Sequence, residues 1–278
     1  MDPNTLATIL ILTSAALHAS WNAAVKRSDN KLAIMVFISV FGGLLFIPFA
    51  PLVPLPDAEL WFFIAASVVI HLIYQLALAH ALEIGELTFI YPIARGLGPL
   101  LVAIFSVIFL TGDLSTVEFI CILVLVFGIF MTMSGRTRDN KGLGAALLTG
   151  SMIATYTLVD GFAVKYADNP FTYIIWGAIA FVPVFFIYIY VMQGRAFLIT
   201  SLRTWRYGIP ASVFALGGYG LALYALSLGT IGEVAALRET SIIFATLIGV
   251  FWLKEKVRHR QILAVALIAF GAVCLKIT

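Results

Sequence analysis

Residues 95–110 read RGLGPLLVAIFSVIFL, an apolar run that begins with an arginine. Together with the residues before it, the run extends from 87 to 110. A helix needs about 20 mostly apolar residues to cross the hydrocarbon layer of a membrane, whereas a membrane β-strand alternates apolar and polar residues over about 10 positions. This run is continuous and does not alternate, so it predicts a membrane-spanning helix.

Nine more runs of this kind occupy the rest of the chain. The ten predicted spans are residues 5–25, 32–53, 59–82, 87–110, 116–134, 143–164, 171–192, 207–229, 233–253 and 259–277. Spans of this length leave only short connectors in a chain of 278 residues. The sequence therefore predicts an all-α membrane protein with ten transmembrane helices and no soluble domain on either side.

The composition agrees with a membrane location. Apolar residues make up 62% of the chain and charged residues 11%, and the mean hydropathy is +1.06. A soluble domain carries ~45–50% apolar and ~25% charged residues. The composition excludes a disordered chain, a nucleic-acid-binding domain and an ordinary cytosolic enzyme. We therefore expect the lipid bilayer, and not nucleic acid, as a partner.

The two cysteines, Cys121 and Cys274, both lie inside apolar runs. We interpret them as buried small hydrophobic residues and not as a disulfide or a metal site. The first run has no Lys or Arg before it and no small-residue cleavage site after it, and Lys26 and Arg27 follow it directly. This pattern predicts a retained first helix and not a signal peptide.

Lys and Arg in short loops predict the orientation, because cytoplasmic loops are enriched in them. With the N-terminus outside, thirteen fall in cytoplasmic loops: Lys26, Arg27, Lys31, Arg136, Arg138, Lys141, Arg195, Arg203, Arg206, Lys254, Lys256, Arg258 and Arg260. Only Lys165 and Lys276 fall on the opposite side, and Arg95 and Arg238 lie within the runs. We expect a multi-pass protein of the bacterial inner (plasma) membrane with both termini outside.

The chain also contains an internal repeat. Residues 24–30 read AVKRSDN and residues 163–169 read AVKYADN, and residues 95–110 correspond to residues 238–253, RETSIIFATLIGVFWL. We expect a first five-helix repeat at 1–135, a cytoplasmic connector at 136–141, and a second repeat at 142–278. An odd number of spans in each half inverts the second half relative to the first. Inverted repeats are frequent in secondary transporters, with the substrate site near the midplane, although duplication is purely structural in some channels and enzymes.

The fourth helix of each half closes on a short motif, Leu110-Thr111-Gly112-Asp113 in the first and Leu253-Lys254-Glu255-Lys256 in the second. With ten helices in two halves, the chain resembles the drug/metabolite transporter superfamily, and within it the EamA-type exporters of amino acids and other metabolites. The second motif has the family's Leu-x-Glu pattern, while the first has Gly-Asp in place of the usual Gly-Glu. The resemblance implies a central cavity lined mainly by helices 1, 3, 4, 6, 8 and 9. It does not fix the substrate.

Ionisable groups inside a membrane cost about 2.5–3.5 kcal/mol at a helix centre, so they normally face a cavity or a partner. We expect Arg95 to bind an anionic group of the substrate, since a guanidinium binds carboxylate or phosphate in a bidentate manner. Arg238 with Glu239 is the expected counterpart in the second half, acting in gating or proton coupling, and Asp160 is a further protonatable candidate. The alternative is a structural ion pair, for example of Arg95 with Glu239, Glu233 or Glu86.

Other polar and aromatic residues share helix faces with these charges. Tyr91, Pro92, Arg95 and Pro99 follow helical spacing, which predicts either a kinked, cavity-lining helix or a plain packing kink. The remaining substrate-binding candidates are His18, Trp21, Asn22, Tyr74, Gln75, Tyr219 and Tyr224. Structural alternatives exist for two of them, because a histidine can simply bridge helices and a tryptophan can anchor the membrane interface.

These features favour a secondary active transporter that works by alternating access and exports a small metabolite such as an amino acid or an organic anion. Two rivals are a flippase for a lipid-linked or amphipathic substrate and an intramembrane transferase. The sequence has no ATP-binding loop and no motif typical of a hydrolase. We therefore expect no enzymatic activity, no catalytic residues, no cofactor and no bound metal, and either a monomer or a homodimer.

Overall fold

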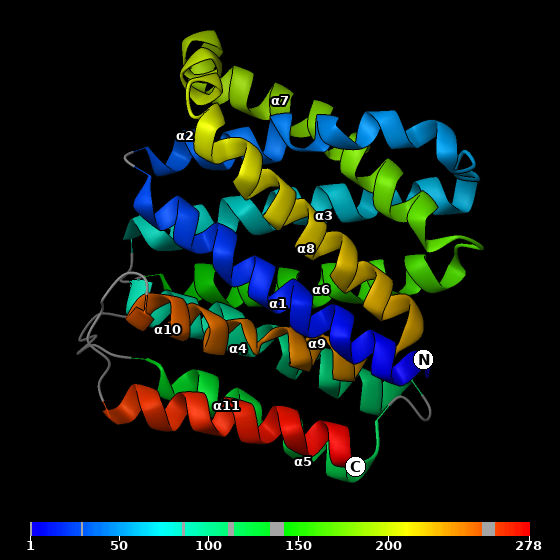
Figure 1. Ribbon diagram of the computed structural model, residues 1–278, viewed down its shortest axis with the longest axis vertical. Helices are drawn as coiled ribbons and strands as arrows, with labels where there is room; N and C mark the ends of the chain where they lie inside the picture. The colour runs from blue at the N-terminus through cyan, green and yellow to red at the C-terminus, as the bar shows by residue number, and fades with distance from the viewer. Residues whose placement is uncertain (1, 29, 85–86, 111–113, 134–141, 252–258) are drawn as a thin grey trace.

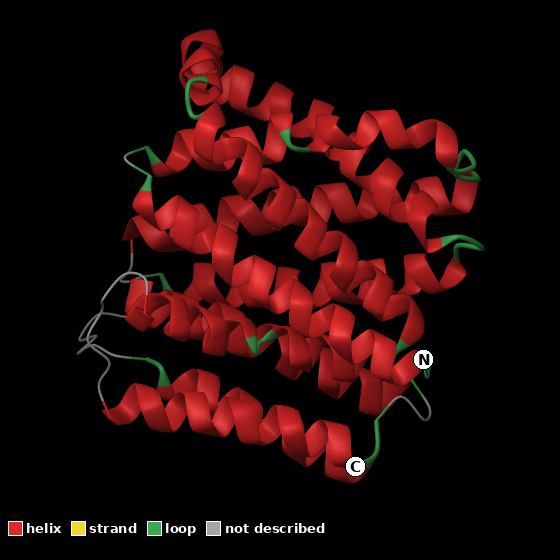
Figure 2. Ribbon diagram, viewed as in Figure 1, coloured by secondary structure: helices red, strands yellow, loops and turns green. Residues whose placement is uncertain are grey.

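The computed structural model describes residues 2–28, 30–84, 87–110, 114–133, 142–251 and 259–278. Within these ranges the chain forms helices and no strands (Figure 2). The helices are α1 (Pro3–Arg27), α2 (Lys31–Val36), η1 (Phe37–Phe41), η2 (Gly43–Leu52), α3 (Ala58–Ile84), α4 (Leu87–Phe109), α5 (Thr116–Met131), α6 (Leu143–Tyr166), α7 (Pro170–Leu202), α8 (Trp205–Leu228), α9 (Ile231–Arg238), α10 (Ser241–Phe251) and α11 (His259–Ile277).

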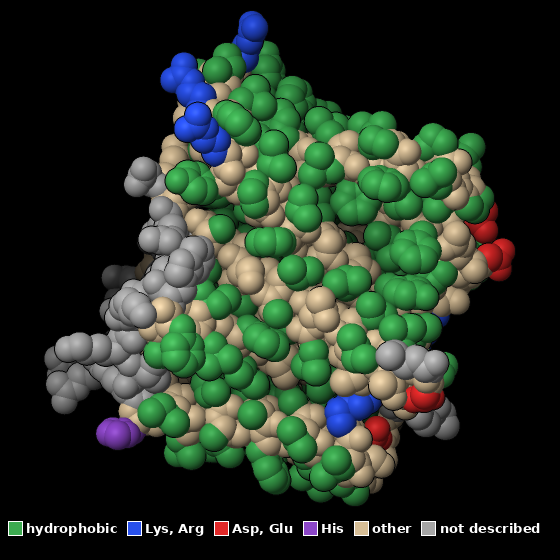
Figure 3. All heavy atoms as spheres, in the orientation of Figure 1, with side chains coloured by type: hydrophobic (Ala, Val, Ile, Leu, Met, Phe, Trp, Pro, Cys, Tyr) green, Lys and Arg blue, Asp and Glu red, His purple; other side chains and the backbone are tan. Residues whose placement is uncertain are grey.

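Nine spans of the described chain are long and apolar enough to cross a membrane, and Thr116–Met131 is a shorter apolar helix. Large apolar side chains such as Leu52, Phe62, Phe109 and Phe270 remain exposed on the sides of the bundle, and Figure 3 shows an apolar surface over most of one face. The prediction of an all-α membrane protein is confirmed.

The helices run roughly parallel or antiparallel across the bundle (Figure 1). α1 packs against α8, α3 and α4 pack against α6, η2 packs against α7, and α5 packs against α11 along one edge. Both termini lie at one end of the bundle, whereas the end of α7 and the beginning of α8, which carry the exposed Arg195, Arg203 and Arg206, lie at the other end (Figure 1).

The second span is irregular, although the apolar run at 32–53 predicted one helix. It begins as α-helix, passes through a π-helical turn and ends as the 3-10 helix η2. Pro48 and Pro51 lie inside η2, and a proline removes a backbone donor and clashes with the preceding turn of an α-helix. A regular α-helix therefore does not continue through this segment.

Helix α7 continues past residue 192, the predicted end of the seventh span, to Leu202. Gly194 interrupts it with φ 77°, a left-handed conformation that glycine adopts at little steric cost. The chain thus ends the span at this glycine and adds a short helix that carries Arg195 and leads into α8.

The ninth span is discontinuous. α9 ends at Arg238, Glu239 is its C-cap, and α10 begins at Ser241. The apolar run at 233–253 predicted a single helix. Broken helices are tolerated at membrane depth where protein or a water-filled cavity satisfies the freed backbone groups, so this break marks a place where function is expected.

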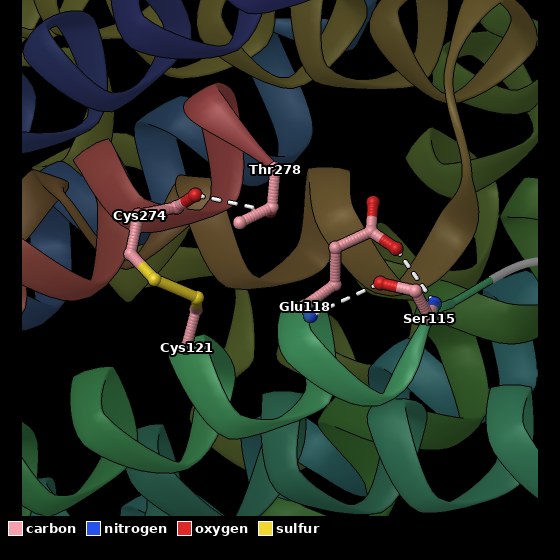
Figure 4. The surroundings of a disulfide bond; sticks show 5 residues. All are labelled: Ser115, Glu118, Cys121, Cys274 and Thr278. Atoms are coloured by element: carbon pink, nitrogen blue, oxygen red, sulfur yellow. Dashed lines mark hydrogen bonds between the residues drawn. A yellow bond between two sulfur atoms is a disulfide. The ribbon is translucent and has the colours of Figure 1, made fainter.

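The interpretation of the cysteines as free, buried residues is wrong. Cys121 of α5 and Cys274 of α11 form a disulfide with their Cα atoms 5.7 Å apart (Figure 4). A capping box of Ser115 and Glu118 begins α5 one turn before Cys121. Because α5 and α11 pack side by side, two cysteines from distant parts of the sequence meet between them.

Candidate functional site

Arg95 of α4 meets Glu239 at the break in the ninth span. The Arg95 Nε and Glu239 Oε2 atoms are 2.9 Å apart, and the two side chains are only 7% and 3% exposed. Within the described residues these two atoms have no aligned hydrogen-bond partner, so the close contact is an ion pair without the geometry of a good hydrogen bond. Arg95 Nη2 also donates to Ser241 Oγ at 3.0 Å. The positive charge of Arg95 is thus already balanced in this state.

Arg238 lies at the end of α9 and is half-buried. Its Cζ atom is 5.8 Å from the centre of the Tyr156 ring, a cation–π distance. In the parts of the chain that the structure describes, no carboxylate lies within ion-pair distance of Arg238. Among the described residues, Arg238 therefore has no direct counter-ion, in contrast to Arg95.

Aromatic rings from three helices surround this arginine. His71 of α3 stacks on Tyr156 of α6 with the ring centres 4.1 Å apart, and it meets the edges of Tyr74 and Tyr219 at 6.5 and 5.7 Å. His71, Tyr74 and Tyr219 stay partly exposed. Their contacts run across α3, α6 and α8, so the aromatic cluster joins these three helices.

A cavity of about 220 Å³ lies beside the ion pair, among the later turns of α1, the first turns of α4 and α11, and α10. Its lining residues include His18 and Asn22 of α1, Tyr91 of α4, Ser241 and Thr246 of α10, and Gln261 of α11. The ring centre of Tyr91 is 6.0 Å from Arg95 Cζ, so the cavity reaches the ion pair.

Two side chains of α1 form hydrogen bonds with His18. Trp21 Nε1 lies 3.4 Å from His18 Nδ1, and Asn22 Nδ2 donates to the His18 carbonyl oxygen at 2.7 Å. Trp21 thus contacts a cavity residue without lining the cavity itself. The helical spacing that selected these three residues places them together on one side of α1.

A second polar cluster surrounds Asp160 of α6, which is 1% exposed. Its carboxylate accepts hydrogen bonds from Ser67 Oγ at 2.6 Å, Tyr173 Oη at 2.7 Å and Tyr219 Oη at 2.6 Å. Asp160 and Tyr219 are predicted site residues, whereas Ser67 and Tyr173 are not predicted from the sequence. Ser67 precedes His71 by one helical turn, and this spacing is the signal that was available.

The structure does not bring every predicted residue to one place. Tyr74 and Tyr219 lie in the aromatic cluster near Arg238, whereas His18, Asn22 and Tyr91 line the neighbouring cavity. Gln75 is half-buried next to Tyr74 in α3. Tyr224 packs instead against Phe171 of α7, with the ring centres 5.2 Å apart.

Comparison with known proteins identifies the family and the fold. The model of the EamA-like transporter family matches residues 140–277, the part of the chain predicted as the second repeat. A solved structure, described only as the crystal structure of a protein, superposes with a TM-score of 0.76 at 16% sequence identity, covering 99% of this chain and 98% of that chain. At this identity the likeness shows the fold alone. No curated protein matches the sequence. The chain belongs to the EamA-like transporters of the drug/metabolite transporter superfamily.

Proposed function

We propose that this transporter is a secondary active exporter of a small metabolite with an anionic group, such as an amino acid or an organic anion, in the bacterial inner membrane. Arg238 carries this proposal. An intramembrane arginine without an ion-pair partner among the described residues is costly to keep, and a substrate carboxylate or phosphate would balance its charge. Tyr74 and Tyr219 would form walls beside the bound group.

The ion pair of Arg95 and Glu239 suggests a second role. Arg95 is neutralised in this state, so we assign the first contact with the anion to Arg238. An incoming anion that displaced Glu239 would also reach Arg95. The two arginines would then hold the substrate from the two halves of the chain, at the break between α9 and α10.

A transporter that works by alternating access closes its substrate site to one side of the membrane while the site is open to the other side. The cavity beside His18 and Tyr91 is lined by the later turns of α1 and the first turns of α4 and α11, which lie away from the two chain termini (Figure 1). Toward the opposite end, Lys276 of α11 forms an ion pair with Glu233 of α9 at 2.5 Å. This pattern supports a cytoplasm-facing state whose outer side is held by the Lys276–Glu233 contact.

A ligand-stabilisation screen tests the proposal. The purified protein would be melted with amino acids, dicarboxylates, phosphonates and organic amines, because a compound that binds the folded state at 100 times its Kd stabilises it by ~2.7 kcal/mol. We expect stabilisation by an anionic or zwitterionic compound. Losing a hydrogen bond to a charged group costs ~1.5–3 kcal/mol, so Arg238→Gln should weaken binding roughly 10- to 100-fold.

The matched control is Arg203→Gln, which removes an exposed arginine and should leave the affinity unchanged. Stabilisation by organic amines alone would contradict the proposal. So would an anion whose affinity is the same in the wild type and in Arg238→Gln.

A further inference from the structure

Asp160 is a buried carboxylate that the proposed substrate site does not use. It receives three hydrogen bonds of 2.6–2.7 Å from hydroxyl groups on α3, α7 and α8. These lengths are typical of O–H donors to an ionised carboxylate. The hydroxyl groups thus satisfy the charge by hydrogen bonding and hold three helices to α6.

No cation balances Asp160 within the described chain, since none of its Lys, Arg or His side chains is in ion-pair distance. The titratable groups around it are His71 and Tyr74 of α3, Tyr156 of α6, Tyr173 of α7 and Tyr219 of α8. On the other helices packed against α6, the central charges are Arg95 of α4, Arg238 of α9 and Glu239. A carboxylate enclosed in this way either keeps an unbalanced charge at membrane depth or binds a proton.

A proton fits this site better than a metal ion. The three hydroxyl oxygens are already at hydrogen-bond distance from the carboxylate, which leaves no room for a cation between them. The described residues also contain no group of three or more His, Cys, Asp or Glu side chains that could hold a metal ion.

A chain of hydrogen bonds leads from Asp160 toward the aromatic cluster beside Arg238. Ser67 Oγ bonds to Asp160 Oδ1 and lies 3.2 Å from His71 Nδ1. His71 is half-buried and stacks on Tyr156, the ring that faces Arg238. Tyr219 also belongs to both clusters, because its hydroxyl binds Asp160 and its ring contacts His71. The chain therefore connects the buried carboxylate to the proposed substrate site.

We propose that Asp160 is the binding site of a coupling proton, delivered through His71 and Ser67. The proposal rests on the proposed transport function and adds the coupling ion. The proton adds to a carboxylate oxygen, and the resulting carboxylic acid carries an O–H donor where it had a lone pair. Oδ1 of Asp160 already accepts two hydrogen bonds, from Ser67 and Tyr173, whereas Oδ2 accepts one, from Tyr219, so the proton adds to the free lone pair of Oδ2. The neutral carboxyl group is a weaker acceptor than the carboxylate, because hydrogen bonds to an ionised acceptor are about twice as strong. Proton binding thereby weakens the contacts of α6 with α3, α7 and α8, and proton release restores them.

Infrared difference spectroscopy reads this site directly, without a substrate. Protein in dodecyl maltoside would be titrated from alkaline to acidic pH in H₂O and D₂O. We expect the carbonyl band of a buried carboxylic acid to appear as the pH falls. The band should be lost in Asp160→Asn and retained in the matched control Asp168→Asn, which changes an exposed aspartate. Tyr219→Phe should keep the band but shift its frequency, because the carboxyl group loses one hydrogen bond.

Three results would overturn the proposal. The wild type could lack a carbonyl band of a buried carboxylic acid that changes with pH, or this band could persist in Asp160→Asn. The third result is a carboxylate band that changes when sodium replaces choline in the buffer at constant pH. If Asp160→Asn shows no cooperative melting transition, the test uses Tyr219→Phe and Ser67→Ala instead. A carbonyl band whose frequency is unchanged in both variants would reject Asp160 as the proton-binding site. A failed substrate screen with an intact titrating band would reject only the proposed anion site.

Discussion

Arg95 and Glu239 provide the sharpest test at the scale of single residues. Both are buried and only 2.9 Å apart. Removing one member of a buried pair strands the other charge and costs about 3–5 kcal/mol, whereas replacing both by apolar residues is often neutral. We expect Arg95→Met and Glu239→Leu each to lower the free energy of unfolding by that amount, and the double variant Arg95→Met/Glu239→Leu to recover most of it. Denaturant unfolding monitored by tryptophan fluorescence measures the difference.

The control variant for this experiment is Arg260→Met, which removes an exposed arginine and should change the stability by less than about 0.5 kcal/mol. Additive losses in the double variant would show that the two side chains contribute independently. Such additivity would contradict the ion pair as described.

The sequence identified the chemically important residues better than their partners. Arg95, Arg238, Glu239 and Asp160 stand out because charge is rare in apolar runs. Their partners depend on how distant helices pack, which the local pattern does not specify. Arg95 had several candidate carboxylates, and only the fold selects Glu239. Asp160 had no predicted partner, and only the fold encloses it with hydroxyl groups of α3, α7 and α8.

At the scale of elements, hydropathy located the spans but not their internal breaks. An apolar run of sufficient length looks the same whether its backbone is one helix or two. Pro48 and Pro51 were a readable sign that the second span is irregular. The break after Arg238 has no such sign, since residues 238–240 contain neither proline nor glycine. It depends on the pairing of Glu239 with Arg95, a contact between helices.

The crossing of α4 and α6 gives a prediction at this scale. A Cβ atom added at Gly150 would lie 2.7 Å from Leu97 Cβ and 3.1 Å from the Ala94 carbonyl oxygen. The contact with the backbone cannot be relieved by turning a side chain, so the two helices must move apart. Overpacking of this kind costs about 1–3 kcal/mol. We expect Gly150→Ala to lower the free energy of unfolding by about that amount, as measured by denaturant unfolding.

Gly144→Ala is the matched control, because it lies in the same helix and a Cβ atom there would have no heavy atom within 4 Å. Alanine is also the better helix former, so this variant should be neutral or slightly stabilising. Equal effects of the two substitutions would show that close approach of α4 and α6 is not what requires glycine at position 150.

At the scale of the whole molecule, the helix contacts support the proposal of two repeats. The first helix of each half packs against the third helix of the other, since α1 packs on α8 and α6 packs on α3. The fifth helices, α5 and α11, pack on each other. Such an exchange of equivalent contacts is what a two-fold relation between halves produces. Sequence identity between the halves is too sparse to predict these contacts one by one.

The disulfide and the orientation together give the last prediction. Cys121 lies in the second turn of α5, and Cys274 lies near the C-terminus, so the bond is close to the end of the bundle that carries both termini (Figures 1 and 4). Disulfides persist in oxidising compartments such as the bacterial periplasm and are rare in the cytosol. The Lys and Arg distribution predicts that this same end lies outside. We therefore expect the bond to form in cells and to join the two halves of the chain covalently.

To measure this, a protease site would be inserted into the 136–141 connector and the protein cleaved after purification with its thiols blocked. On a non-reducing gel the two halves should migrate together, and they should separate with reductant or in Cys121→Ser.

The bond encloses a long loop, and removing a native disulfide costs about 2–5 kcal/mol, so Cys121→Ser should also unfold at lower denaturant concentration. A C-terminal alkaline phosphatase fusion should be active, because that enzyme needs the oxidising side. Free thiols together with an inactive fusion would contradict the outward termini, whereas free thiols with an active fusion would contradict only the disulfide.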